Sequence, residues 1–212
     1  MKKTLSILLA LVLAFSLASC GGEKKDEKKD ASVVVTGLCE AVKTFDKERI
    51  KVLLANGDIS LIDQKSALLP EEFLATMKTW AENIEYEIGE ITVDDITATA
   101  SVKFKYSDAA LAMTEASKLY NEKVSLLMGA DATNGYLGGS ARSNKDKETL
   151  SKEINEFLLQ CLNSGVEKEG LQDIEEIVTV PLVKYQGDWK IKNLSDDIFR
   201  IMTSNVFAFS YD

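Results

Sequence analysis

ITATASVKFKY, residues 96–106, is the stretch that decides the fold. Its apolar side chains occur at every second position and alternate with threonine, serine and lysine: Ile96, Ala98, Ala100, Val102, Phe104 and Tyr106. Successive side chains of a β-strand point to opposite faces of the sheet, so this period of two predicts a strand with one buried and one solvated face. Such a strand is typical of an antiparallel sheet whose core lies on one side.

A partner strand precedes this stretch. Ile84, Tyr86 and Ile88 alternate with acidic residues, and the alternation resumes one residue out of phase after Gly89, which predicts a β-bulge there. Asp94 and Asp95 would form the turn of the hairpin. A second hairpin is expected from about 173–185 and 189–192, with Val178, Val180 and Leu182 on the inner face of its first strand. None of the inward positions assigned to these strands carries an acid.

Helical spacing of apolar residues surrounds the two hairpins. The expected helices are about 32–45, a short one that begins after Asp46 and ends near Gly57, one from Pro70 to about Ala81, then about 108–129, about 148–163 and a final one capped by Ser195. A polar loop is expected before Pro70. The predicted class is α+β, with helices packed on one face of a curved antiparallel sheet and a helical insertion at about 108–165 between the hairpins.

The N-terminal residues are typical of an exported lipoprotein. Lys2 and Lys3 precede an apolar run that is shorter than a membrane-spanning helix, as in a secretory signal peptide. The run ends in Leu17-Ala18-Ser19-Cys20, which resembles the bacterial lipobox. That resemblance implies cleavage after Ser19 and acylation of Cys20. An ordinary signal peptide with a chance cysteine is the alternative.

The residues after Cys20 are glycine and mixed charges, GGEKKDEKKDA. Such a segment has little apolar surface to bury, so we expect residues 20–31 to form a flexible charged tether, followed by a single α+β domain at 32–212. Binding of the tether lysines to anionic lipid is the alternative, which the interleaved acids disfavour.

The composition excludes several classes of function. The net charge of −9 becomes −11 when residues 1–19, with two lysines and no acid, are removed, and a chain this acidic is a poor nucleic-acid binder. There is no histidine, which excludes Ser-His-Asp and Cys-His nucleophile pairs and His-ligated zinc. No cofactor and no metal is expected. Export would allow a disulfide between Cys39 and Cys161, although burial as small apolar residues is favoured.

Both ends of the mature chain carry a family resemblance. GLCEAVKTFDKERIKVLLANGD, from Gly37, and VPLVKYQGDWKIKNL, from Val180, resemble the opening helices and closing hairpin of NTF2-like (cystatin-like α+β) lipoprotein domains of unknown function, of the DUF4878 type. The resemblance implies a cone-shaped fold, in which a curved sheet and helices enclose a cavity at the open end, and an extracytoplasmic binding or accessory role. The predicted helical insertion departs from compact members of that family.

The candidate site follows from this cavity. Five aromatic residues are expected either to line it or to belong to the plain core: Trp80, Tyr86, Phe104, Tyr106 and Trp189. Five acids in and after the first strand could bind calcium or act in acid–base catalysis, but their phase favours a solvated face: Glu85, Glu87, Glu90, Asp94 and Asp95. The glycine-rich loop 135–140 could wrap an anion or form a lid, and a plain connector is favoured.

We therefore expect a lipid-anchored protein on the extracytoplasmic side of the cell membrane or outer membrane, without catalytic residues. It would bind a small-molecule ligand or an envelope protein, and no nucleic acid. A small cavity enzyme that uses a carboxylate or tyrosine, and a structural accessory of a cell-envelope complex, are the alternatives.

Overall fold

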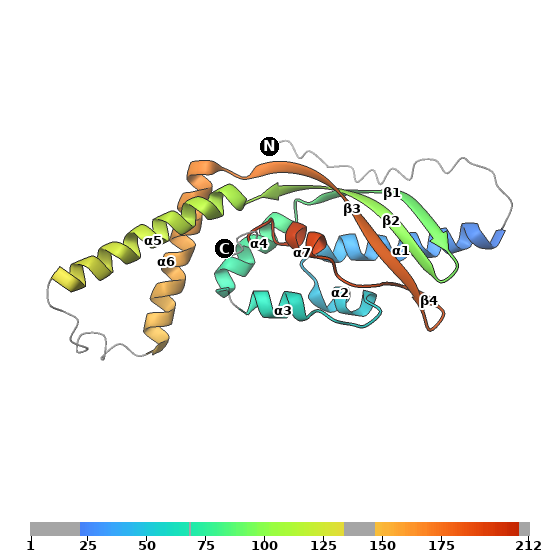
Figure 1. Cartoon of the computed structure of the whole chain (residues 1–212), viewed down its shortest axis with the longest axis horizontal. Helices are drawn as coiled ribbons and strands as arrows, with labels where there is room; N and C mark the ends of the chain where they lie inside the picture. The colour runs from blue at the N-terminus through green and yellow to red at the C-terminus, as the bar shows by residue number, and fades with distance from the viewer. Residues whose placement is uncertain (1–21, 68, 134–146, 208–212) are drawn as a thin grey trace, which may run out of the picture.

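The computed structural model describes residues 22–67, 69–133 and 147–207, and its fold is α+β, as predicted (Figure 1). A four-stranded antiparallel sheet carries helices against its inner face, and two further helices extend from one end. The elements in chain order are α1 (Gly22–Lys43), α2 (Lys47–Leu53), α3 (Ser60–Ser66), α4 (Glu71–Ala81), β1 (Glu85–Asp94), β2 (Thr97–Asp108), α5 (Ala110–Thr133), α6 (Lys147–Glu169), β3 (Gln172–Tyr185), β4 (Asp188–Ile191) and α7 (Asp196–Met202).

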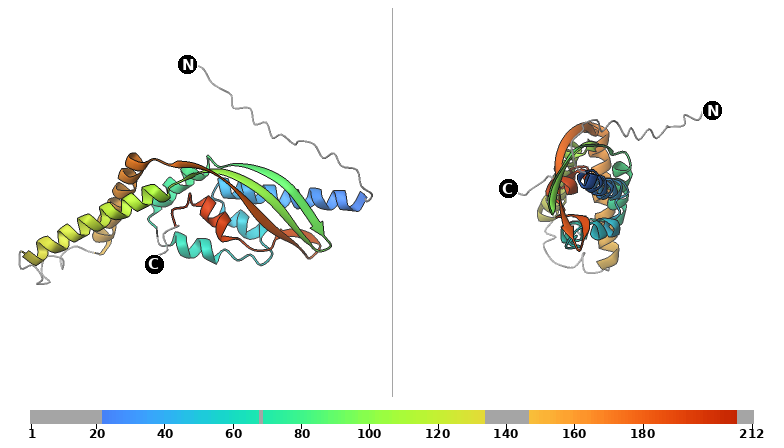
Figure 2. Two further views of the ribbon diagram at one scale, coloured as in Figure 1. Left: turned by 45° about the horizontal axis from the view of Figure 1, so that its top comes forward. Right: turned by 90° about the vertical axis from the view of Figure 1, so that its right-hand side faces the viewer.

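The sheet is a simple meander with the strand order β1-β2-β3-β4. The register of β1 on β2 shifts between Ile88 and Ile91, so the bulge predicted at Gly89 is confirmed. The sheet curves around the helices, as Figure 2 shows. Its longest pairing is that of β2 with β3, which runs from Thr97 opposite Val183 to Asp108 opposite Gln172.

The main core lies between the inner face of the sheet and α1. The alternating residues of β2 from Ala98 to Tyr106 are buried on this face, and Val178, Val180 and Leu182 of β3 lie beside them. Ile96, expected on the same face, instead lies in the turn before β2 and is 56% exposed. From the helix side, Val35, Leu38 and Val42 pack into the same cluster. The period-two pattern therefore places each side chain of β2 on the face that was predicted.

The predicted helical insertion is confirmed. The strands on either side of it, β2 and β3, are neighbours in the sheet. Helices α5 and α6 form a hairpin that joins the paired strands β2 and β3 and extends away from the sheet (Figure 1). We call this pair the helical arm. Its base packs on a second apolar cluster that holds Phe73, Met77, Ala109, Leu162 and Val206.

Two helices differ from the sequence-based expectation. Residues 22–31, predicted as part of a flexible tether, form the first turns of α1, and Ala31 is fully buried. Helix α3 occupies the region predicted as a polar loop, with Ile62 as its buried residue. Among the described residues, no helix has both the length and the apolar character needed to cross a bilayer.

Candidate functional site

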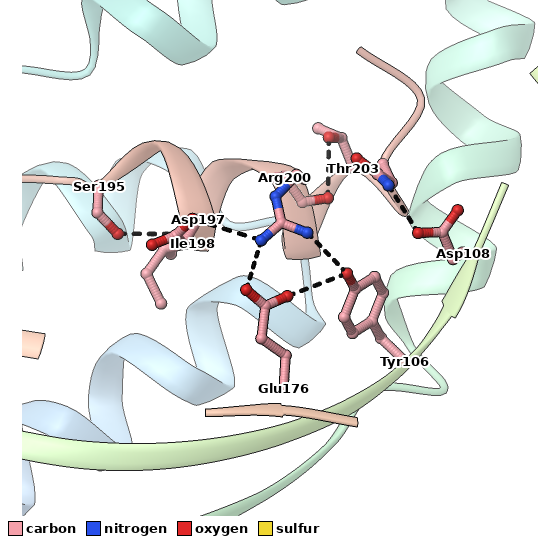
Figure 3. Close-up of polar contacts among 9 residues, drawn as sticks. Tyr106, Asp108, Glu176, Ser195, Asp197, Ile198, Arg200 and Thr203 are labelled. Carbon is pink, nitrogen blue, oxygen red and sulfur yellow. Dashed lines mark hydrogen bonds and ion pairs between the residues drawn. The ribbon is translucent and has the colours of Figure 1, made fainter. Parts of the chain in front are cut away.

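A cluster of hydrogen-bonded polar side chains lies on the inner face of the sheet, at the end nearest the helical arm. Tyr106 of β2, Glu176 of β3 and Arg200 of α7 point toward one another there (Figure 3). One guanidinium nitrogen of Arg200 donates to the Tyr106 hydroxyl at 3.1 Å, and the other donates to the Glu176 carboxylate at 2.5 Å. The Tyr106 hydroxyl also donates to Glu176 at 3.3 Å. Helix α7 holds Arg200 in place because Ser195 caps its first turn by accepting from the Ile198 amide.

The electrostatics of this cluster keep Tyr106 protonated and Arg200 charged at neutral pH. Burial raises the pKa of Tyr106 to about 12, against the opposing effect of the nearby Arg200 charge. The hydrogen bond to Glu176 raises the pKa of the Arg200 guanidinium further above its usual range. A phenol that stays protonated and a carboxylate whose oxygens are already bonded are poorly suited to proton transfer near pH 7.

Asp108 continues the same face of β2, and it joins the strand to the helical arm. It is 5% exposed. One of its carboxylate oxygens accepts from the Ala110 amide at 2.7 Å, at the start of α5, and the other accepts from the Asn205 side chain at 2.6 Å. The Ala109 amide donates to the Ser204 carbonyl at 2.9 Å. These bonds fix the junction of β2, α5 and the segment after α7, which is a structural role.

The five aromatic residues proposed as a cavity lining lie mostly in the core. Phe104 is fully buried and Trp189 is 5% exposed. The half-buried Tyr86 donates its hydroxyl to Glu40 at 2.6 Å, and Trp80 packs half-buried against the second apolar cluster. Tyr106 borders a hollow of about 210 Å³, whose other lining residues are Asn83, Glu85, Lys105, Ser107 and Asp173. This hollow is polar and open, unlike the apolar interior expected of a ligand-binding cone.

The five acids proposed as a calcium or acid–base site are exposed, four of them lie on β1, and two of those four lie opposite lysines of β2. Glu85 pairs with Lys105 and Glu87 with Lys103 in the sheet register, and Lys103 also forms an ion pair of 2.6 Å with Glu175. Among the described residues, no group of three acids or cysteines could hold a metal ion. These positions match the solvated face that was favoured.

The cysteines lie apart. Cys39 is buried in α1 in the main core, whereas Cys161 is buried on α6 of the helical arm, and no bond joins them. Burial raises the pKa of the Cys39 thiol to about 12. Cys20 and the glycine-rich loop 135–140 lie outside the described residues.

Sequence reasoning missed Glu176 and Asp108, and the statement that no inward strand position carries an acid is wrong. Glu176 shares the phase of Val178 and Val180, and Asp108 shares the phase of Tyr106. Extending each alternation by one step would have placed both acids on the inner face. The pairing with Arg200 could not have been found in this way, because it depends on where α7 crosses the sheet.

Comparison with models of protein families, with curated proteins and with solved structures finds no match for this chain.

Proposed function

We propose that this protein is a lipid-anchored, extracytoplasmic interaction module that binds another protein of the cell envelope and catalyses no reaction itself. The anchor would be an acylated Cys20, which follows the lipobox-like residues Leu17-Ala18-Ser19. Two or more acyl chains anchor a protein stably in a membrane, whereas a protein with a single chain binds reversibly. The NTF2-like resemblance of both chain ends, with the accessory role that it implies, belongs to the same proposal.

The filled inner face of the sheet is the observation that supports a role without catalysis. Phe104, Val102 and Ala100 are fully buried under α1, so the space that a ligand would occupy in an open cone holds core side chains. The inward polar side chains Tyr106, Glu176 and Arg200 bind one another. A protein of this kind is best suited to recognition through its outer surface.

The helical arm is part of that outer surface, and it extends from the body beyond the end of the sheet (Figure 1). Leu111, at its base on α5, is 53% exposed. We therefore place the partner contact on the arm.

The anchor is tested by intact mass spectrometry of the full chain, exported in a bacterial host and extracted from its membranes. The expected mass is that of residues 20–212 with a diacylglyceryl group and, where the host adds it, an amide-linked acyl chain. A Cys20→Ser variant should lose the lipid mass. An unmodified Cys20 in the membrane-extracted protein would refute the anchor.

The partner contact is tested by photo-crosslinking on intact membranes. A photoreactive residue at Leu111 of α5 and, separately, at the exposed Asn163 of α6 should capture the same protein. A photoreactive residue at Ile177, which is 69% exposed on the outer face of β3, is the matched control and should not capture it. Native mass spectrometry of the same preparation showing a retained small molecule would point instead to a ligand-binding protein.

A further inference from the structure

The first turns of α1 begin almost at the predicted anchor. One residue, Gly21, separates Cys20 from Gly22. A trans-linked residue spans at most about 3.6 Å, so the start of α1 lies next to whatever holds Cys20. The expected flexible tether would have let the body lie at a variable distance from the lipid, whereas a helix that begins here keeps its first residue close to it.

Glu27 fastens these first turns to the β3–β4 hairpin. Its carboxylate forms an ion pair with Lys184 and accepts a hydrogen bond of 2.7 Å from the indole nitrogen of Trp189. The Glu27 and Lys184 side chains are both about two-thirds buried. Glu27 lies five residues into the helix, which is about 7.5 Å along its axis. The β3–β4 hairpin is therefore held close to the anchored end of α1.

The β1–β2 turn lies at this same end. The Lys184 amide donates to the Ile96 carbonyl at 2.8 Å, which brings the two turns together. Ile96 is 56% exposed and Tyr185 is 48% exposed, although both are large apolar side chains. Figure 1 shows the start of α1 and both turns at one end of the long axis, and the helical arm at the other. We call residues 94–97 and 185–188 the turn end of the sheet.

We propose that the turn end of the sheet lies against the headgroup layer of the membrane that anchors Cys20, with Ile96 and Tyr185 touching it. This inference rests on the proposed lipid anchor. Gly21 limits the distance from the lipid to the helix, and Glu27 limits the distance from the helix to the hairpin. The helical arm then faces away from the anchored end.

The charges of the turn end define the kind of contact. Asp94, Asp95 and Asp188 are exposed there, while Lys184 is bound to Glu27 and Lys190 donates to the Val52 carbonyl. Acids keep this end out of the hydrocarbon region, whereas tyrosine favours the headgroup level. The surface therefore suits an interfacial contact with zwitterionic lipid.

Two positions on one strand make a matched test. Tyr185 and Gln172 are both exposed and lie at opposite ends of β3, separated by about 43 Å measured along the strand. Acylated Tyr185→Cys and Gln172→Cys variants would each carry a fluorophore in phosphatidylcholine vesicles with a spin-labelled headgroup. Background labelling of the buried native cysteines is measured on the wild-type chain, which is treated with the same fluorophore. Equal far-ultraviolet spectra would show that each variant folds.

We expect the headgroup quencher to reduce the emission of the label at 185 at least threefold more than that of the label at 172. Inserting a flexible segment of Gly and Ser between Gly21 and Gly22 should remove the difference. Equal quenching in the acylated chain without the insertion, or stronger quenching at 172, would overturn the inference while leaving the anchor intact. An unacylated Cys20 would overturn the anchor and this inference with it, and the intact mass distinguishes the two results.

Discussion

At Gly165 the backbone of α6 lies close against that of α5, and replacing this glycine with alanine should force the two helices apart. A Cβ atom at this position would lie 2.2 Å from the Ala112 carbonyl oxygen and 3.2 Å from the Ala116 amide nitrogen. Carbon and carbonyl oxygen usually come no closer than about 3.3 Å. The obstacle is helix backbone, which cannot rotate away as a side chain can.

The expected loss combines two opposing effects. Overpacking a filled interior costs about 1–3 kcal/mol, and a clash with backbone belongs at the upper end. Alanine in place of glycine favours a helix by up to about 1 kcal/mol. We therefore expect Gly165→Ala to lower the free energy of unfolding by about 2 kcal/mol, which for a chain of this size lowers the melting temperature by about 4–8 °C.

Gly37 provides the matched control, because it is also buried in a helix. A Cβ there would lie 3.3 Å from the end of the Leu53 side chain, which can move by a few tenths of an ångström. Gly37→Ala should therefore be neutral or stabilise by up to about 1 kcal/mol. Thermal and urea unfolding followed by circular dichroism measure both variants, and hydrogen exchange of α5 and α6 locates the loss. A Gly165→Ala protein as stable as the wild type would refute the close crossing.

Three further predictions concern the polar side chains. Arg200→Met should lower the free energy of unfolding by about 1–2 kcal/mol in urea denaturation, because Tyr106 and Glu176 lose their donor, whereas Arg49→Met on the exposed side of α2 should change it by less than about 0.5 kcal/mol. Because the folded-state pKa of Tyr106 is raised from 10.0 to about 12, its contribution to stability is present below pH 10 and is lost as the pH rises through 12. A Tyr106→Phe variant should lack that tyrosine step in an alkaline absorbance titration. Hydrogen bonds from Lys184 and Trp189 lower the pKa of Glu27 below 4.5, so its contribution is present above pH 4.5 and is lost as the pH falls through the lowered value. The protection of the α1 first-turn amides from hydrogen exchange, relative to the intrinsic exchange rate at each pH, should therefore decrease in acid, and in Glu27→Gln this acid dependence should disappear.

Each of these has a contrary outcome. Equal losses for the two arginine variants would mean that the inner cluster contributes nothing beyond an ordinary surface residue. An unchanged alkaline titration in Tyr106→Phe would mean that the phenol does not titrate near pH 12. Exchange in α1 with the same acid dependence in wild type and Glu27→Gln would mean that the helix start is not held by this carboxylate.

The strands were predictable because their periodicity repeats a single rule over many residues. The β2 pattern fixes the inner face without reference to any other element, and Gly89 marks the bulge by a visible change of phase. The helix cap at Ser195 and the start of α4 after Pro70 follow from the residue types at the helix ends. All of these depend on neighbours in the sequence alone.

The helix at 22–31 was missed because its composition was considered without its context. Lysine and glutamate are good helix formers, and adding turns to an existing helix costs far less than starting one. The ion pair of Glu27 with Lys184 joins residues 157 apart in the chain, so no local pattern could show it. The same reason hides the pairing of Arg200 with Glu176. Helix α3 was missed because no capping side chain marks its start. Its N-cap residue Ile59 makes no side-chain hydrogen bond, whereas Asp46 and Ser195 cap the equally short α2 and α7.

The position of the helical arm has a consequence for the order of folding. The arm separates the partners of the longest strand pairing, so β2 and β3 can meet only after a loop of roughly sixty residues closes. Closing such a loop as a random chain, rather than a four-residue one, costs about 2.4 kcal/mol of entropy, since each doubling of length costs about 0.6 kcal/mol. If the two helices dock first, their ends at Ala110 and Glu169 come together, and the central strands behave as neighbours in a short hairpin. The crossing at Gly165 would then set the rate at which the sheet forms as well as its final stability.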